Sequence, residues 1–201
     1  MEQIASVLEQ EGYSVFLPQR DGLEFARLFP RFLERGMSAE NAQKILNMAI
    51  FSLDVFQILD SQGLLLNMNG RVPDEGAMVE AGIAWAHNKA VVVFRSDSRS
   101  LIEGNCNPLV MGLSGFSYIR TYDKIVAAFD DKFSAVNEGV LLAKDAQCES
   151  ATKSGREISS YLRSRRSGDD IAELLINLFG ERICQSSEDP RGNCSQAHMQ
   201  L

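Results

Sequence analysis

The chain has 201 residues, of which 45% are hydrophobic, enough for one domain of about 100 to 150 residues and an appendage. Twenty-seven acidic residues against twenty basic ones give a formal charge of -7, and no basic stripe is interleaved with aromatic residues, which argues against a nucleic-acid groove. No apolar run approaches the roughly 20 residues of a membrane span. Residues 1–12 are amphipathic and acidic rather than a signal peptide, so the expected location is cytoplasmic.

The cysteine and histidine inventory predicts no metal site. The four cysteines show no C-x-x-C pairing, and only two histidines are available to complete a ligand set. We therefore expect reduced thiols and no zinc site. These residues are Cys106, Cys148, Cys184, Cys194, His87 and His198.

The first elements in chain order are a helix, a strand and a second helix. Apolar residues recur at helical spacing from Ile4 to Leu8, and this helix is expected to end at Gly12. The sequence SVFLP (14–18) is typical of a short buried strand. A helix is expected over about 22–35, where Pro30 should kink it or split it in two.

A longer helix and the second strand follow. Ser38 is a good N-cap for a helix whose apolar residues recur at helical spacing as far as Leu59. The sequence GLLLNM (63–68) is too short for a helix and nearly continuous in its apolar character, as in a strand buried on both faces.

The middle of the chain continues the alternation of helices and strands. Gly76 opens a helix that contains Glu80, AVVVF (90–94) is a buried strand, and FSYI (116–119) is a weaker one after a polar loop. This alternation predicts a parallel sheet with helices on both faces, an α/β fold. In such sheets the ligand lies beyond the carboxyl ends of the strands, where polar residues gather here.

The remainder of the chain differs in character. Segments around 158–162 and 171–179 are predicted to be helical, and the polar end of the chain is predicted to be disordered. We therefore expect a main domain at 1–137 and a helical extension with a disordered tail at 138–201.

Three carboxylates in apolar or loop-end positions suggest glycosyl chemistry. Glu80 is the only charge between Ala77 and Ala86, and an N-terminal helix dipole would favour its anion by roughly 0.3 to 1 kcal/mol. Asp74 lies in the preceding loop, and Asp54 lies alone in an apolar helix. In glycosyl transfer one anion attacks the anomeric carbon while another group moves the proton of the leaving group.

Each of these residues also has a purely structural interpretation. Glu80 can be a helix-dipole partner, Asp54 can be solvated, and Asp74 can make an Asx-turn after Pro73. Gln19 can belong to a plain polar loop after the predicted strand, and Asn107 can initiate a turn before Pro108.

Taken together, several segments resemble the nucleoside 2-deoxyribosyltransferase family over about residues 1–125. They are FLPQRDG (16–22), Asp54, NGRVPDEGAMVEAGIAWA (69–86), AVVVF (90–94) and NPLVMGL (107–113). The most specific part is Asp-x-Gly-x-x-x-Glu, formed here by Asp74, Gly76 and Glu80. The resemblance implies a flavodoxin-like sheet that lacks the family's usual first, central strand. Strands two and three would then pair directly, another segment would fill the gap, or the sequence is truncated.

The resemblance also implies the roles of the site residues. Glu80 would attack C1′ of a 2′-deoxynucleoside to form a covalent deoxyribosyl-enzyme, and Asp54 would handle the proton of the base. Asp74, next to Gly76, would hold a sugar hydroxyl, and Gln19 would contact the base. Asn107 would reach the 5′-hydroxyl in a neighbouring subunit's site, because family members are homo-oligomers. No cofactor is implied.

Three functional hypotheses follow. The first is transfer of 2-deoxyribose between nucleobases, with deoxynucleosides and free nucleobases as partners. The second is an N-glycosidase that hydrolyses 2′-deoxynucleoside 5′-monophosphates; there Asp74 would repel the phosphate, which favours free nucleosides. The third is a non-catalytic nucleoside-binding protein.

Overall fold

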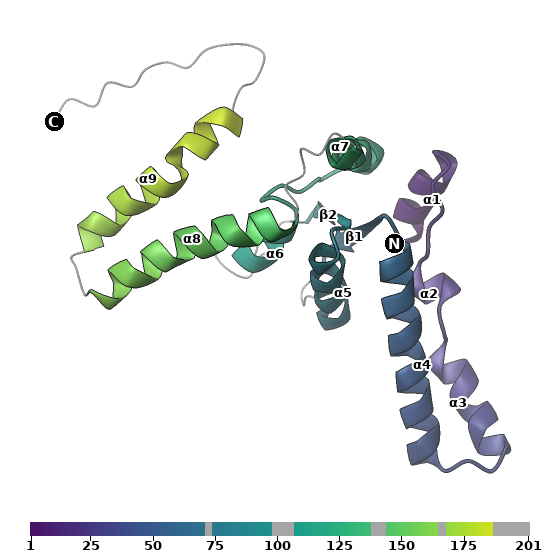
Figure 1. The fold of residues 1–201 in the computed structure, drawn as a ribbon. Helices are drawn as coiled ribbons and strands as arrows, with labels where there is room; N and C mark the ends of the chain where they lie inside the picture. The colour runs from purple at the N-terminus through teal and green to yellow at the C-terminus, as the bar shows by residue number, and fades with distance from the viewer. Residues whose placement is uncertain (71–73, 98–106, 138–143, 165–167, 187–201) are drawn as a thin grey trace. The chain divides into compact units, whose positions relative to one another are not determined.

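The computed structural model describes residues 1–70, 74–97, 107–137, 144–164 and 168–186 (Figure 1). The chain divides into two compact units, Met1–Lys144 and Asp145–Leu201. Among the described helices, none is long and apolar enough to cross a membrane. The predicted polar loop after β2 lies largely outside the described residues, and so does the C-terminal end for which disorder was predicted.

The first unit is built around a pair of parallel strands. β1 (Gly63–Asn67) pairs with β2 (Ala90–Phe94) in a register that joins Gly63 to Ala90 and Asn67 to Phe94. Helix α5 (Glu75–Ala86) connects them, so the three elements form a βαβ unit. β2 is buried along its whole length, as its β-branched sequence predicts, whereas β1 is partly buried.

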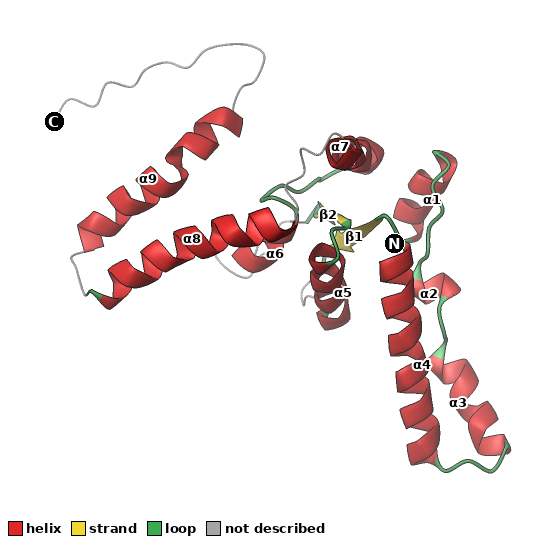
Figure 2. Ribbon diagram, in the orientation of Figure 1, coloured by secondary structure: helices red, strands yellow, loops and turns green. Residues whose placement is uncertain are grey.

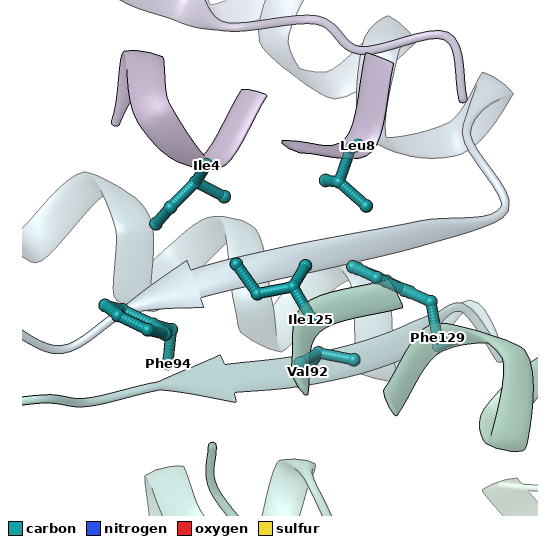
Figure 3. Packing of buried hydrophobic residues seen from close by; sticks show 7 residues of the cluster. Ile4, Leu8, Val92, Phe94, Ile125 and Phe129 are labelled. Atoms are coloured by element: carbon teal, nitrogen blue, oxygen red, sulfur yellow. The ribbon is translucent and has the colours of Figure 1, made fainter. Parts of the chain in front are cut away.

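One face of the sheet is covered by α1 (Glu2–Gln10) and α7 (Ile125–Asn137). Figure 3 shows Ile4 and Leu8 of α1 beside Val92, Ile125 and Phe129. The predicted apolar face of the first helix is confirmed, since Ile4, Ala5 and Leu8 are buried.

The opposite face is covered by α5, by α6 (Pro108–Leu113) and by the end of α4 (Ala39–Asp60). Ala81 and Ala84 of α5 are fully buried against the sheet, because their small side chains let the helix approach the strands closely. Helices therefore lie on both faces of a parallel sheet, and the prediction of an α/β, flavodoxin-like fold is confirmed.

Helix α3 (Phe25–Glu34) packs along the N-terminal half of α4 (Figure 1). The predicted N-cap of α4 is confirmed, because the Ser38 hydroxyl accepts a hydrogen bond from the Asn41 N–H at 3.3 Å. Pro30 does not split α3, contrary to one expectation. Pro30 cannot donate the hydrogen bond that would reach the Ala26 carbonyl, so α3 lacks one backbone hydrogen bond there but continues as one helix.

The prediction of a strand at 14–18 is wrong. Pro18 instead begins the short helix α2 (Pro18–Asp21), and the Asp21 carboxylate accepts the Leu17 N–H at 2.8 Å. In the described part of the chain no backbone hydrogen bond joins residues 13–17 to β1, so the predicted second and third strands do not pair directly. The segment keeps its apolar role all the same, since Leu17 is buried and Val15 packs on the cluster between α1 and α7.

The weaker strand predicted at 116–119 reduces to one bridge. Ile119 donates its N–H to the Val93 carbonyl and accepts the Arg95 N–H, which forms a parallel bridge beside Phe94. Phe116 has a positive φ of 63°, a conformation that no strand residue adopts. Because Phe116 belongs to the turn between Ser114 and Ser117, no strand forms over 116–119, and the 3-10 helix η1 (Tyr122–Lys124) follows.

Two long helices make up most of the described residues after 143 (Figure 2). Helix α8 (Lys144–Arg163) and helix α9 (Gly168–Ser186) include both segments for which helical structure was predicted. The domain boundary between 137 and 138 stays a prediction.

Candidate functional site

The chain brings α4 and α5 side by side near the sheet. Each helix leads into a strand of the same parallel pair, so the two helices run in the same direction. Ile58 of α4 and Ala84 of α5 belong to one buried cluster. Asp54 precedes Ile58 by four residues and Glu80 precedes Ala84 by four, which places both carboxylates one turn closer to the carboxyl edge of the sheet.

Asp54 and Asp74 lie near enough to Glu80 for their charges to act on its carboxyl group. Burial raises the pKa of Glu80 above its ordinary value of 4.5, and the nearby negative charges of Asp54 and Asp74 raise it further. Burial also raises the pKa of Asp54. Burial and like charges therefore act against the stabilisation that the N-terminal dipole of α5 gives to the Glu80 anion, the effect that the sequence emphasises.

Asp74 is the N-cap of α5. Its Oδ1 accepts the Ala77 N–H at 3.2 Å, so the structural interpretation of this residue is realised. In the described part of the chain its other oxygen, Oδ2, makes no hydrogen bond and remains available to a ligand. A Cβ atom added at Gly76 would lie 3.2 Å from Asp74 Oδ1, so the glycine leaves room for the carboxylate.

A side-chain network joins the two loops that leave the sheet at its carboxyl edge. Asn69 Oδ1 accepts the N–H groups of Ser96 at 2.8 Å and of Asp97 at 3.2 Å, and Asn69 Nδ2 donates to Ser96 Oγ at 2.8 Å. Asp97 Oδ2 accepts the Gly70 N–H at 2.8 Å. Sequence reasoning placed polar residues after both strands but did not single out Asn69, whose amide can pair across the two loops only because the strands are adjacent.

Two predicted site residues, Asn107 and Gln19, are not among the residues that the structure brings together around Glu80. Asn107 is the N-cap of α6, where its Oδ1 accepts the Leu109 N–H at 2.9 Å, as its structural interpretation required. Gln19 is exposed on α2, and in the described residues its side chain makes no hydrogen bond. Its neighbour Arg20 is instead paired with Glu9 at 2.7 Å and with Asp21 at 2.8 Å.

The predicted site residues that the structure brings together are carboxylates. Within the described stretches, no group of three or more histidine, cysteine, aspartate or glutamate side chains is arranged to hold a metal ion. What the structure does bring together is Asp54, Asp74 and Glu80, with Gly76 beside them, at the end of a βαβ unit where parallel sheets bind their ligands.

The fold and the site together define a class of protein: an α/β protein with grouped carboxylates at the carboxyl edge of a parallel sheet. Comparison with protein families gives the more particular result: residues 1–155 match the model of the nucleoside 2-deoxyribosyltransferase family, and the chain belongs to that family. The match supports a deoxyribosyltransferase type of enzyme that acts on nucleosides. A search of curated proteins found no match.

Proposed function

We propose that this protein transfers 2-deoxyribose from a deoxynucleoside to a free nucleobase through a covalent intermediate on Glu80. The observation that carries the proposal is the match of residues 1–155 to the family, together with the half-buried position of Glu80 on α5 near Asp54 and Asp74. A half-buried carboxylate beside two others is poorly solvated, and its anion is correspondingly reactive toward an electrophilic carbon.

The reaction has two displacements. A Glu80 oxygen attacks C1′, and the N-glycosidic bond breaks with its electron pair going to the base nitrogen. A nitrogen of the second base then attacks C1′, the ester to Glu80 breaks, and the configuration at C1′ is retained overall.

Asp54 would carry the proton in both steps. Burial raises its pKa, so the protonated form is more populated than in a solvated aspartate, and the carboxyl can donate to the departing base. The same carboxylate then accepts the proton that the incoming base loses.

The remaining assignments follow the family. Asp74 would hold a sugar hydroxyl through Oδ2 while Oδ1 caps α5, with Gly76 leaving space for both. Gln19 would contact the base. Asn107 would serve the site of a neighbouring subunit in a homo-oligomer. We place this activity in a domain at 1–137, followed by an extension at 138–201, in a cytoplasmic protein.

The negative charge of the site favours free nucleosides over nucleotides. A 5′-phosphate dianion near Asp54, Asp74 and Glu80 would be repelled, which disfavours the alternative in which water hydrolyses a deoxynucleoside 5′-monophosphate. A protein that binds nucleosides without turnover is the remaining alternative.

One pair of incubations separates these functions. Deoxyinosine with adenine should yield deoxyadenosine, whereas deoxyinosine monophosphate alone should yield no hypoxanthine. Hypoxanthine in the second incubation would support the hydrolase, and binding without product in either would support the non-catalytic protein. Glu80→Gln should abolish transfer, while Glu75→Gln, an exposed glutamate in the first turn of the same helix, should leave it unchanged.

A further inference from the structure

Helix α2 is only four residues long, and three of the four fix its own backbone. Pro18 opens the helix, because its ring holds φ near the helical value. Gly22 closes it by donating its N–H to the Pro18 carbonyl at 3.0 Å, and a Cβ atom at Gly22 would lie 2.4 Å from that oxygen. Arg20 and Asp21 form a charged network. The remaining residue, Gln19, is exposed, and in the part of the chain that the structure describes its side chain makes no hydrogen bond.

Arg20 and Asp21 hold each other by two hydrogen bonds. Arg20 Nε donates to Asp21 Oδ1 at 2.8 Å and Arg20 Nη2 donates to Oδ2 at 2.9 Å, the paired geometry that makes guanidinium–carboxylate contacts directional. Asp21 Oδ2 also accepts the Leu17 N–H at 2.8 Å. Arg20 Nη2 donates further to Glu9 Oε1 on α1 at 2.7 Å and to the Val15 carbonyl at 3.2 Å. One guanidinium therefore ties α2 both to α1 and to the segment that precedes α2.

This network contributes little to the stability of the whole fold. The side chains of Arg20 and Glu9 are each 39% exposed and that of Asp21 is 32% exposed, and ion pairs so open to water add little to the free energy of unfolding. Leu17, which is 4% exposed, already anchors the segment in the apolar interior. What the network adds is a fixed orientation of the residues that follow Leu17.

We propose that Arg20 is a positioning residue, which fixes α2 so that the Gln19 amide meets the nucleobase in one orientation. The inference rests on the proposed function for the contact between Gln19 and the base. A glutamine amide offers an acceptor oxygen and two N–H donors, and it bonds two neighbouring atoms of a base edge only when its direction is set. If α2 were loose in the free protein, the base would have to order it on binding, which lowers affinity. Arg20 provides that order in advance.

Steady-state kinetics of transfer from deoxyinosine to adenine test the inference. Arg20→Ala should raise the KM for adenine about three- to tenfold, the effect of ordering a short segment and one side chain on binding, and should change kcat less than about twofold. Arg20→Lys keeps the charge but not the paired geometry, so it should recover part of the loss. Arg27→Ala, at an exposed arginine of α3, is the matched control and should leave the KM unchanged.

A double variant separates positioning from a general structural effect. Gln19→Ala alone should raise the KM for adenine at least as much as Arg20→Ala does. Adding Arg20→Ala to Gln19→Ala should then raise the KM no further, because Arg20 acts through the side chain that has been removed. A further rise in the double variant, or an unchanged KM in Arg20→Ala alone, would overturn the inference.

Amide hydrogen exchange without substrate tests the same claim independently of activity. The N–H groups of Arg20 and Asp21 donate to the Leu17 carbonyl, each at 2.8 Å, and that of Gly22 donates to Pro18. In Arg20→Ala the amides of residues 20–22 should exchange several-fold faster, whereas those of β2 should exchange as in the native protein. Equal exchange at 20–22 in the two proteins would show that Arg20 does not hold α2.

Calorimetric binding of deoxyinosine distinguishes a failure of this inference from a failure of the proposed function. If the native protein binds deoxyinosine but transfers no sugar, the proposed function is contradicted, and the dissociation constants then decide the inference. A constant about three- to tenfold larger in Arg20→Ala than in the native protein would support it, and equal constants would overturn it. If deoxyinosine is neither bound nor converted, both are contradicted.

Discussion

Asn69 holds the carboxyl edge of the sheet together, and replacing it tests that role. Asn69→Ala removes three hydrogen bonds, to the N–H groups of Ser96 and Asp97 and to Ser96 Oγ. Each such bond contributes about 0.5 to 1.5 kcal/mol net. Because Asn69 and Asp97 are only partly buried and Ser96 is exposed, water can replace some of these bonds, so we expect a loss of about 1 to 3 kcal/mol in the free energy of unfolding.

The assay is urea unfolding of the native protein and the variant, followed by circular dichroism and tryptophan fluorescence. Asn69→Asp keeps the acceptor oxygens but not the Nδ2 donor, so its loss should be smaller than that of the alanine variant. Asn47→Ala, at an exposed helix position, is the control and should not destabilise the protein. An Asn69→Ala protein as stable as the native one would refute the idea that the amide pins the two loops.

Three further predictions concern the carboxylates. Glu80→Gln should stabilise the fold at neutral pH, because the pKa of Glu80 in the folded protein is raised above 4.5 and the native protein loses stability as pH rises through that pKa. In pH-dependent melting curves the stability difference between variant and native protein should vanish below about pH 4, and a difference that persists there would contradict this prediction. Asp54→Asn should lower the pKa of Glu80 in a carbon-13 NMR titration of the labelled carboxyl groups, whereas Asp60→Asn at the exposed end of α4 should not; an unmoved Glu80 would mean that the two charges do not interact. Gly76→Ala should press on Asp74 Oδ1, weaken the cap of α5 by about 0.5 to 2 kcal/mol in thermal unfolding, and lower transfer; full activity and stability would show that the carboxylate has room to move.

Local sequence signals predicted the elements whose stability is local. The spacing of Ile4 and Leu8, the cap at Ser38 and the β-branched run of β2 each act within a few residues, and all three are as expected. The segment 14–18 failed because a strand needs a paired neighbour, and no local signal reports whether that neighbour is present. At Phe116 a turn of positive φ prevailed over β propensity.

The candidate site divides in the same way. Glu80 and Asp54 stood out because charges are rare in apolar helices, and the fold brings both of them to Asp74. The Asn69 network was missed because its partners are 27 and 28 residues away in the sequence.

The most direct test of the central claim is to identify the residue that becomes attached to the sugar. A 2-fluoro-substituted deoxynucleoside, whose electronegative fluorine slows both displacements, should trap the intermediate for intact-mass spectrometry and peptide mapping. The account predicts one added sugar, located on Glu80 and absent from Glu80→Gln. A sugar attached to another residue, or transfer activity that persists in Glu80→Gln, would contradict it.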